Sequence, residues 1–404
     1  MNSGDTAFML IATAMVMLMT PGLALFYGGL VRSKNILTTM MHSFACLGIV
    51  SIIWVVYGYS LAFGPDVGGI IGNLDWALLN GVGLEPGRYA ATIPHLLFCA
   101  FQLMFAIITP ALITGAWAER MKFSAYLIFT TLWITLVYFP VCHWVWGGGW
   151  IGGLGGLDFA GGTVIHINSG AAALVAALVI GKRKGFGKEA FHPHNLPMTM
   201  LGAGLLWFGW FGFNAGSALA AGQTATLAFF TTQVAAGTAA LAWIVAEWFM
   251  QGKPTTLGVA SGAVAGLVAI TPAAGFVSPL AAIIIGLVAG VLCYLAVLMK
   301  AKLGYDDALD VVAVHGVGGL WGALATGLFA SLAWNPAGAN GLFHGNPDQF
   351  GIQAYGAFAT IAYSVVVTFI ILKAIDWTVG LRVKVDEENQ GLDLSQHSEI
   401  GYTF

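Results

Sequence analysis

Two histidines lie inside strongly apolar stretches of the chain, and a glycine follows each of them four residues later. His166 lies in TVIHINSG, which ends at Gly170, and His315 lies in VAVHGVGG, which ends at Gly319. Ionisable groups are costly inside a membrane, where they mostly line a pathway or pair with one another. Glycine lets two helices approach closely. The repeated pattern therefore predicts two helices that cross at a pair of histidines.

A pair of neutral imidazole rings can pass a proton, because one ring donates its N–H to the bare nitrogen of the other. This chemistry suits a small substrate that exchanges a proton and is uncharged in one form. Two alternatives stay open. The histidines could be structural residues bonded to the backbone, or they could ligate a haem iron in a bis-histidine electron carrier. Two haems would normally require four such ligands, which disfavours the haem reading.

Aromatic residues near the ends of several apolar stretches have the chemistry to bind a small cation. Trp146 lies in HWVWGGGW, Phe101 and Phe105 bound FQLMF, and Phe213 and Ser217 lie in WFGWFGFNAGSA. Ring faces attract a cation, and a hydroxyl oxygen can accept its hydrogen bond. Several of the 14 tryptophans instead fit the aromatic belts at the membrane interfaces.

Asp158 precedes the apolar stretch that carries His166. Aspartate is a favoured residue at the start of a helix, where its carboxylate accepts backbone N–H groups. The same residue also places an anion just outside the predicted cation site. The two roles are compatible.

The composition predicts that these residues are held by membrane helices. The 404 residues are 58% hydrophobic and 8% charged, and they include 55 glycines, far from the usual soluble composition. Apolar runs of about 20 residues are long enough to cross a bilayer. We expect eleven such spans, at about 7–29, 38–63, 95–117, 123–141, 162–181, 196–218, 226–250, 256–273, 279–299, 309–332 and 352–375.

The basic residues test this number of spans, because Lys and Arg collect in cytoplasmic loops. With the amino terminus outside, eleven spans leave only Arg88 of the 15 Lys and Arg residues outside. The predicted protein is therefore multi-pass, with its carboxyl terminus in the cytoplasm. The residues expected inside are Arg32, Lys34, Arg120, Lys122, Lys182, Arg183, Lys184, Lys188, Lys253, Lys300, Lys302, Lys373, Arg382 and Lys384.

The two histidine stretches are the fifth and the tenth predicted spans. Two units of five spans must enter the membrane in opposite orientations, which is the inverted-repeat plan of many transporters. The predicted fold is thus an all-α membrane protein with inverted five-helix repeats at about 7–181 and 196–332. An eleventh helix at 352–375 completes a transmembrane domain over 1–375, and 376–404 form a cytoplasmic tail.

Several other features predict little chemistry. A net charge of −3 gives no reason to expect a nucleic-acid partner, and the four cysteines lack the C-x-x-C spacing of metal sites. No metal, cofactor or enzymatic activity is expected. The connection at 64–94 is expected to carry a short surface helix. His192 and His194 are expected to be solvated loop residues.

A set of long, ordered motifs resembles the Amt branch, of prokaryotic type, of the Amt/Rh/Mep ammonium transporters. The resemblance runs from Met1 into the tail, and 333–351 match no motif of the family. The motifs are PGLALFYGGLVRSKN, AFQLMFAIITPALITGAWAER, HWVWGGGW, LDFAGGTVIHINSG, GWFGFNAGSA, ITPAAGF, DVVAVHGVGG and GLDLSQH.

The resemblance implies roles for these residues in ammonium uptake through the cell inner membrane. Trp146, Phe105 and Ser217 would form an outer ammonium site, with Phe101 beside them and Asp158 needed for its architecture. Phe105 and Phe213 would form a stacked gate. His166 and His315 would be a twin-histidine pair in an apolar pore that conducts ammonia, with or without the proton.

The resemblance also implies partners. The chain would form a homotrimer with one pore per subunit in membrane lipid, and methylammonium would act as an analogue of ammonium. The GLDLSQH segment, residues 391–397, would pack beneath the pore and a neighbouring subunit. A PII-type signal protein could then plug the inner mouth. The competing functions are a passive ammonia channel and an ammonium sensor that signals through its cytoplasmic tail, beside the haem-binding electron carrier named above.

Overall fold

Each of the eleven predicted spans is helical in the computed structural model of the chain, which describes residues 1–403. Ten helices of this part of the chain are long and apolar enough to cross a membrane, whereas α11 has 15 residues and is almost wholly buried. The predicted all-α membrane fold is therefore confirmed. In order, the spans contain α1 (Ser3–Leu30), α2 and α3 (Ile36–Ile53, Tyr59–Phe63), α4 (His95–Ile113), α5 and α6 (Phe123–Trp133, Phe139–Val145), α8 (Asn168–Ile180), α9 (Leu196–Gly216), α10 (Gln223–Gln251), α11 (Thr256–Ile270), α12 (Pro279–Leu303), α13 (Gly318–Phe329) and α14 (Pro347–Thr378).

Wide π-helical turns interrupt several spans. Two of them, Trp54–Gly58 and Ile134–Tyr138, join the paired helices α2 with α3 and α5 with α6. Two more, Gly162–Ile167 and Val312–Val317, begin the fifth and tenth spans and contain the two histidines. Such turns occur frequently at functional sites, because the extra residue re-aims side chains.

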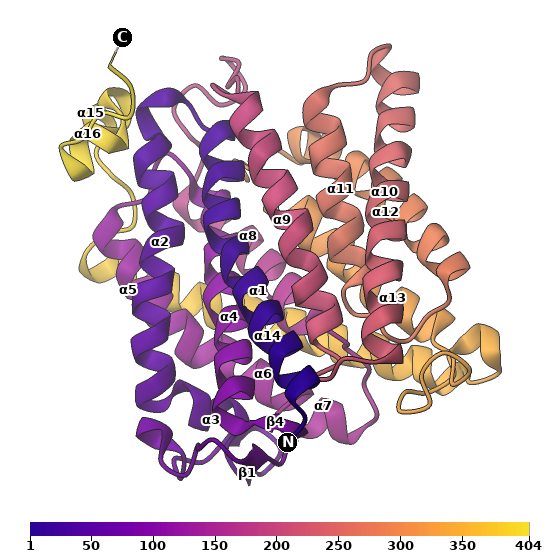
Figure 1. Cartoon of the computed structure of the whole chain (residues 1–404). Helices are drawn as coiled ribbons and strands as arrows, with labels where there is room; N and C mark the ends of the chain where they lie inside the picture. Colours follow the sequence, from indigo (N-terminus) through magenta and orange to yellow (C-terminus); the bar gives the residue numbers. More distant parts are fainter. Residues whose placement is uncertain (404) are drawn as a thin grey trace.

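The inverted repeat relates the fifth span to the tenth. The chain runs through α8 toward the end of the bundle that carries the carboxyl terminus, and it runs through α13 away from that end (Figure 1). Asp158 precedes His166 by eight residues, and Asp307 precedes His315 by the same interval. The second aspartate was missed in the sequence. α14 lies outside the repeat and packs against α5, α8 and α13.

The amino and carboxyl termini lie at opposite ends of the bundle (Figure 1). The end with the carboxyl terminus, which we call the basic face, includes the connections 31–35, 118–122, 181–195, 252–255 and 304–311 and the residues after 378. The other end, the opposite face, contains Arg88 and the connection 64–94. The placement of the Lys and Arg residues and the directions of the helices thus agree with the prediction that successive loops alternate between the two faces.

The connection at 64–94 does not contain the expected surface helix. It forms two short antiparallel pairs, β1 (Asp66–Val67) with β2 (Ile71–Gly72) and β3 (Pro86–Gly87) with β4 (Ala90–Pro94). Gly68 and Gly69 both have positive φ, which a tight hairpin turn requires and glycine adopts without strain. The only helical turn here is the 3₁₀ segment Ala77–Leu79. A further short helix, α7 (Trp150–Gly153), lies at the same face.

The tail folds onto the basic face as α15 (Val385–Gln390) and α16 (Leu392–His397), beside α2 (Figure 1). The carboxylate of Asp393 accepts the N–H groups of Leu37 and Thr38 at 3.0 and 2.8 Å, at the start of α2. His194 is not the solvated loop residue expected from the sequence. Its Nδ1 lies 2.8 Å from the carbonyl oxygen of Val31, and its Nε2 lies 2.9 Å from the hydroxyl of Tyr402.

Candidate functional site

Two cavities meet at a pair of phenylalanine rings. The aromatic cavity, of about 260 Å³, opens near the opposite face, and the histidine cavity, of about 340 Å³, leads toward the basic face. Phe105 lines the first and Phe213 lines the second. Their ring centroids are 4.4 Å apart and their planes are inclined by 39°, so the rings are tilted rather than stacked. These two rings therefore separate the cavities.

The aromatic cavity brings together the residues that the sequence predicts for a cation site. Trp146, Phe105 and Ser217 all line it, and the Trp146 and Phe105 ring centroids are 6.1 Å apart in an edge-to-face arrangement. The indole N–H of Trp146 donates to the carbonyl of Asp158 at 2.8 Å. The Ser217 hydroxyl donates to the carbonyl of Phe213 at 2.8 Å, which leaves its oxygen able to accept from a ligand.

Phe101 and Asp158 lie behind the aromatic cavity and do not line it. Phe101 is wholly buried, and its ring centroid is 4.8 Å from that of Phe105. The buried Asp158 carboxylate accepts four backbone N–H groups at the start of the fifth span, from residues 161–164, at 2.6 to 3.1 Å. Burial raises the pKa of Asp158 to about 6, and these N–H groups oppose that rise. Asp158 thus supports both the helix start and Trp146.

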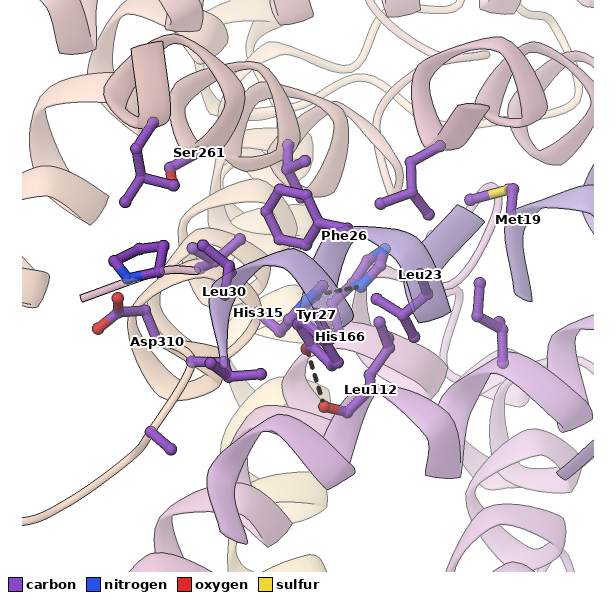
Figure 2. Close-up of a pocket in the computed structure, with 18 of the residues that line it drawn as sticks. Met19, Leu23, Phe26, Tyr27, Leu30, Leu112, His166, Ser261, Asp310 and His315 are labelled. Carbon is purple, nitrogen blue, oxygen red and sulfur yellow. Dashed lines mark hydrogen bonds between the residues drawn. The ribbon is translucent and has the colours of Figure 1, made fainter. Parts of the chain in front are cut away.

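The two predicted histidines meet at the start of the histidine cavity. Figure 2 shows His166 and His315 facing one another, and their Nδ1 atoms are 3.2 Å apart. Both are buried, and the rings are nearly parallel, with an interplanar angle of 19°. The ring of Trp210 stacks on His166 at a centroid distance of 5.4 Å. A separation of 3.2 Å leaves no space for an iron and a porphyrin between the rings, which disfavours the haem alternative.

The glycines that follow the histidines allow this contact. A Cβ on Gly170 would lie 2.3 Å from the Cα of Gly316, and a Cβ on Gly319 would lie 2.9 Å from the Cβ of His166. Real Cβ atoms are not found in such close contact, so the two segments could not cross here with a larger residue. The predicted close crossing of the two helices is confirmed.

The histidine cavity is mainly apolar near the histidines and charged toward the basic face. Asp310 lies farther along the cavity in Figure 2. Its carboxylate is 2.5 Å from the Lys300 ammonium, which also donates to the carbonyl of Asp307 at 2.8 Å. Arg183 pairs with Asp306 at 2.9 Å. The sequence pattern predicted Lys300 and Arg183 only as charges of cytoplasmic loops and did not predict a role for the acidic residues, although the adjacent aspartates at 306–307 are a usable signal.

Comparison with known proteins agrees with this geometry. The model of the Ammonium Transporter Family matches residues 7–402. An ammonium transporter of Bacillus subtilis is 56% identical over 100% of this chain and 99% of its own length, and the ammonium transporter Amt1 of Archaeoglobus fulgidus is 51% identical over the full length of both. The crystal structure of Mep2 from Candida albicans superposes with a TM-score of 0.90 at 38% identity, over 96% of this chain and 88% of that one.

The matches span the whole chain, so they include both cavities and the segments that position them. The relatives are named as ammonium transporters, which are membrane proteins that move a substrate and not enzymes. With its helical spans, its inverted halves and its buried histidine pair, the chain belongs to the ammonium transporter family.

Proposed function

We propose that this ammonium transporter recruits the ammonium cation in the aromatic cavity, removes its proton and conducts ammonia through the histidine cavity. The proposal rests on three features that follow one another from the opposite face toward the basic face. They are an aromatic cavity, a closed pair of phenylalanine rings and a buried histidine pair. Trp146 and Phe105 offer ring faces to the cation, and Ser217 offers a hydroxyl oxygen. Phe101 and Asp158 support these groups from behind.

The proposed separation of ammonia from its proton follows from solvation. A cation that leaves water for an apolar channel loses far more hydration energy than neutral ammonia does. Phe105 and Phe213 form the proposed gate, and beyond them the cavity wall near the histidines is mainly apolar. Ammonia and the proton therefore move more easily by separate routes than together.

The histidine pair is the proposed route for the proton. Only one proton fits between the Nδ1 atoms of His166 and His315, so one ring is the donor and the other the acceptor. The acceptor ring then carries its own proton on Nε2, and the donor ring has a bare Nε2. The pair thus presents a donor at one end and an acceptor at the other, and each transferred proton reverses this polarity.

An ammonium pulse applied to proteoliposomes tests the relay. Charge movement and internal pH are recorded together for the parent protein, His166→Ala, His315→Ala and the control His192→Ala, which alters an exposed histidine of the basic face. The relay predicts a sharp fall in current in the first two variants and none in the control, with any ammonia leak retained. Full current and full ammonium selectivity in both pore variants would show that the histidines are structural.

The remaining proposals concern the setting of the pore. We infer an inner-membrane homotrimer with one pore per subunit, the amino terminus outside and the carboxyl terminus in the cytoplasm. The division into a transmembrane domain over 1–375 and a tail over 376–404 belongs to the same proposal. Cysteines introduced at Ser3 and Ser398 should react with impermeant reagents from opposite sides of the membrane, and labelling from one side would contradict the topology.

The tail is proposed to regulate transport, because α16 is anchored to the start of α2 by Asp393. A PII-type signal protein is the proposed partner at this face. Truncation after Val385 should alter transport or its inhibition by that partner, and unchanged values of both would contradict the proposal. We favour transport over a sensor function, since relatives that are 56% and 51% identical over the whole chain are named as ammonium transporters.

A further inference from the structure

The turn that carries Trp146 is held to the connection at 64–94 by a buried histidine. His143, in α6, is fully buried, and its carbonyl accepts the N–H groups of Gly147 and Gly149 at 3.0 and 2.9 Å. Trp146 lies inside this turn and lines the aromatic cavity. The position of the His143 ring therefore bears directly on the position of the Trp146 indole.

Both ring nitrogens of His143 face hydrogen-bond acceptors. Nδ1 lies 3.0 Å from the carbonyl oxygen of Ala62, and Nε2 lies 2.9 Å from the carboxylate of Asp66. A carbonyl and a carboxylate cannot donate, so both contacts are hydrogen bonds only if both nitrogens bear protons. Hydrogen bonds from His143 and from the Gly69 N–H hold the pKa of Asp66 below its ordinary value, so Asp66 is a carboxylate that accepts and does not donate.

A second clamp acts on the same turn from the same connection. The guanidinium of Arg88 donates to the carbonyl of Gly147 at 3.1 Å. The hydroxyl of Tyr89 shares its single proton between the carbonyls of Phe63 and Gly147, at 2.7 and 2.9 Å. Gly147 also packs so closely that a Cβ there would lie 2.1 Å from the carbonyl oxygen of Ala62. The turn is therefore fixed at two points, and only the His143 contact requires a proton on both nitrogens of an imidazole ring.

We infer that His143 and Asp66 form a proton-dependent latch that positions Trp146 and so sets the affinity of the aromatic cavity for ammonium. The inference rests on the cation site proposed above. In the imidazolium form, the Nε2 proton binds Asp66 to α6. When one proton leaves, the ring keeps a single N–H, so one of its two nitrogens presents a bare lone pair to an acceptor, either the Ala62 carbonyl or the Asp66 carboxylate, and that contact becomes repulsive. The latch opens and the turn with Trp146 loses one of its two clamps.

Other titratable groups at this face do not account for such a switch. Tyrosine and cysteine titrate well above neutral pH, and burial raises the pKa of Tyr89 further, to about 12. His95 lies near this region, but its Nε2 contacts the Tyr59 hydroxyl at 2.6 Å and not the Trp146 turn. The charged and titratable groups on the segments packed around His143 are Asp66, Arg88, Tyr59, Tyr89, Tyr138, Cys142, Asp158 and, at the central crossing, His166.

Uptake of labelled methylammonium into cells that lack other ammonium transporters tests the latch. Methylammonium remains a cation across the range, so its own titration does not change the result. The half-saturation concentration of the parent protein should rise roughly three- to tenfold as external pH increases from about 6 to about 8.5, where imidazolium loses its proton. The maximal rate is analysed separately, because the proposed relay affects it.

Asp66→Asn is the decisive variant. The amide can turn either its oxygen or its NH₂ group toward Nε2, so the contact survives in both protonation states and the pH profile should be flat within about twofold. Asp75→Asn is the matched control, because Asp75 is an exposed carboxylate of the same connection that bonds to Asn73 instead. This control loses the same charge and should keep the parent profile. His143→Gln should also give a flat profile.

The outcomes separate the latch from the cation site. If Trp146→Leu weakens half-saturation but Asp66→Asn keeps the parent pH profile, the latch is wrong and the site stands. If Trp146→Leu leaves half-saturation unchanged, the proposed site is itself wrong. If Asp75→Asn flattens the profile as much as Asp66→Asn does, surface charge and not the latch explains the pH dependence, and the inference is overturned.

Discussion

The fifth and tenth spans share a scaffold but differ in how their aspartates are used. Asp158 and Asp307 precede His166 and His315 by the same number of residues, and both carboxylates accept backbone N–H groups at the helix start. Asp158 accepts four such groups. One oxygen of Asp307 bonds to the Val312 N–H at 2.7 Å, while the other has no hydrogen-bond partner in the described residues. The two halves of the inverted repeat therefore place an aspartate at the same position, but the two aspartates accept different numbers of hydrogen bonds.

The two mouths that these spans reach differ even more. The mouth at the opposite face is lined by aromatic rings with the Ser217 hydroxyl. The mouth at the basic face carries Arg183, Lys300 and Asp310. An inverted repeat thus supplies a symmetrical crossing at the centre, where both halves contribute one histidine, and leaves each mouth free to acquire different chemistry. Substitutions at matched positions can test how far the symmetry extends.

The largest effect is expected where the two spans touch. In Gly170→Ala, the new methyl group would overlap Gly316, and overpacking of this kind costs about 1–3 kcal/mol or more in the free energy of unfolding. Gly316→Ala is the matched control, because its Cβ would meet nothing closer than 3.5 Å. Thermal unfolding of the purified protein should show a large loss only for Gly170→Ala. Equal losses would mean that the crossing is not as close as described.

The next largest effect concerns the two aspartates. Asp158→Asn replaces one acceptor oxygen by an NH₂ group that faces backbone donors, so we expect a loss of about 1–2 kcal/mol in stability. Asp307→Asn can keep its single bond to Val312, and a loss of about 1 kcal/mol or less is expected. Unfolding curves of both variants measure the difference. Similar losses of stability in both variants would show that the hydrogen bonds of the two aspartates, like their positions, are equivalent in the two halves.

Trp146 tests the difference between the mouths, since the histidine cavity offers no tryptophan at the basic face. Trp146→Leu removes a ring face but keeps an apolar side chain, so methylammonium half-saturation should weaken by about 1–2 kcal/mol, the value of a desolvated cation–π contact. Trp377→Leu, a highly exposed position at the end of α14, is a control that should leave half-saturation unchanged. An unchanged value for Trp146→Leu would remove its proposed role.

The smallest expected effect is at Ser217. Ser217→Ala removes one acceptor from the aromatic cavity and should weaken half-saturation by about 0.5–1.5 kcal/mol. Ser217→Thr keeps the hydroxyl and should recover most of the loss. If alanine and threonine behave alike, the hydroxyl does not bind the cation, and the difference between the two mouths rests on the aromatic rings alone.

Much of the fold follows from local properties of the sequence. Apolar length and the placement of Lys and Arg predicted eleven spans and their alternation, because hydrophobic thickness and charge act on each segment separately. The histidine and glycine spacing predicted the central crossing, because a helix repeats its faces at fixed intervals. The connection at 64–94 was predicted less well, since short strands depend on their pairing across the chain.

The sequence by itself therefore determined the membrane class, the helices and which residues could meet at the centre. Only the tertiary structure decided how these residues meet. The rings of Phe105 and Phe213 separate the two cavities, and the carbonyl of Asp158 accepts the indole N–H of Trp146. The carboxylate of Asp66 contacts the ring of His143. These contacts join segments that lie far apart in the chain or in different helices. Their distances depend on how whole helices pack, and packing is set by all the side chains of an interface together.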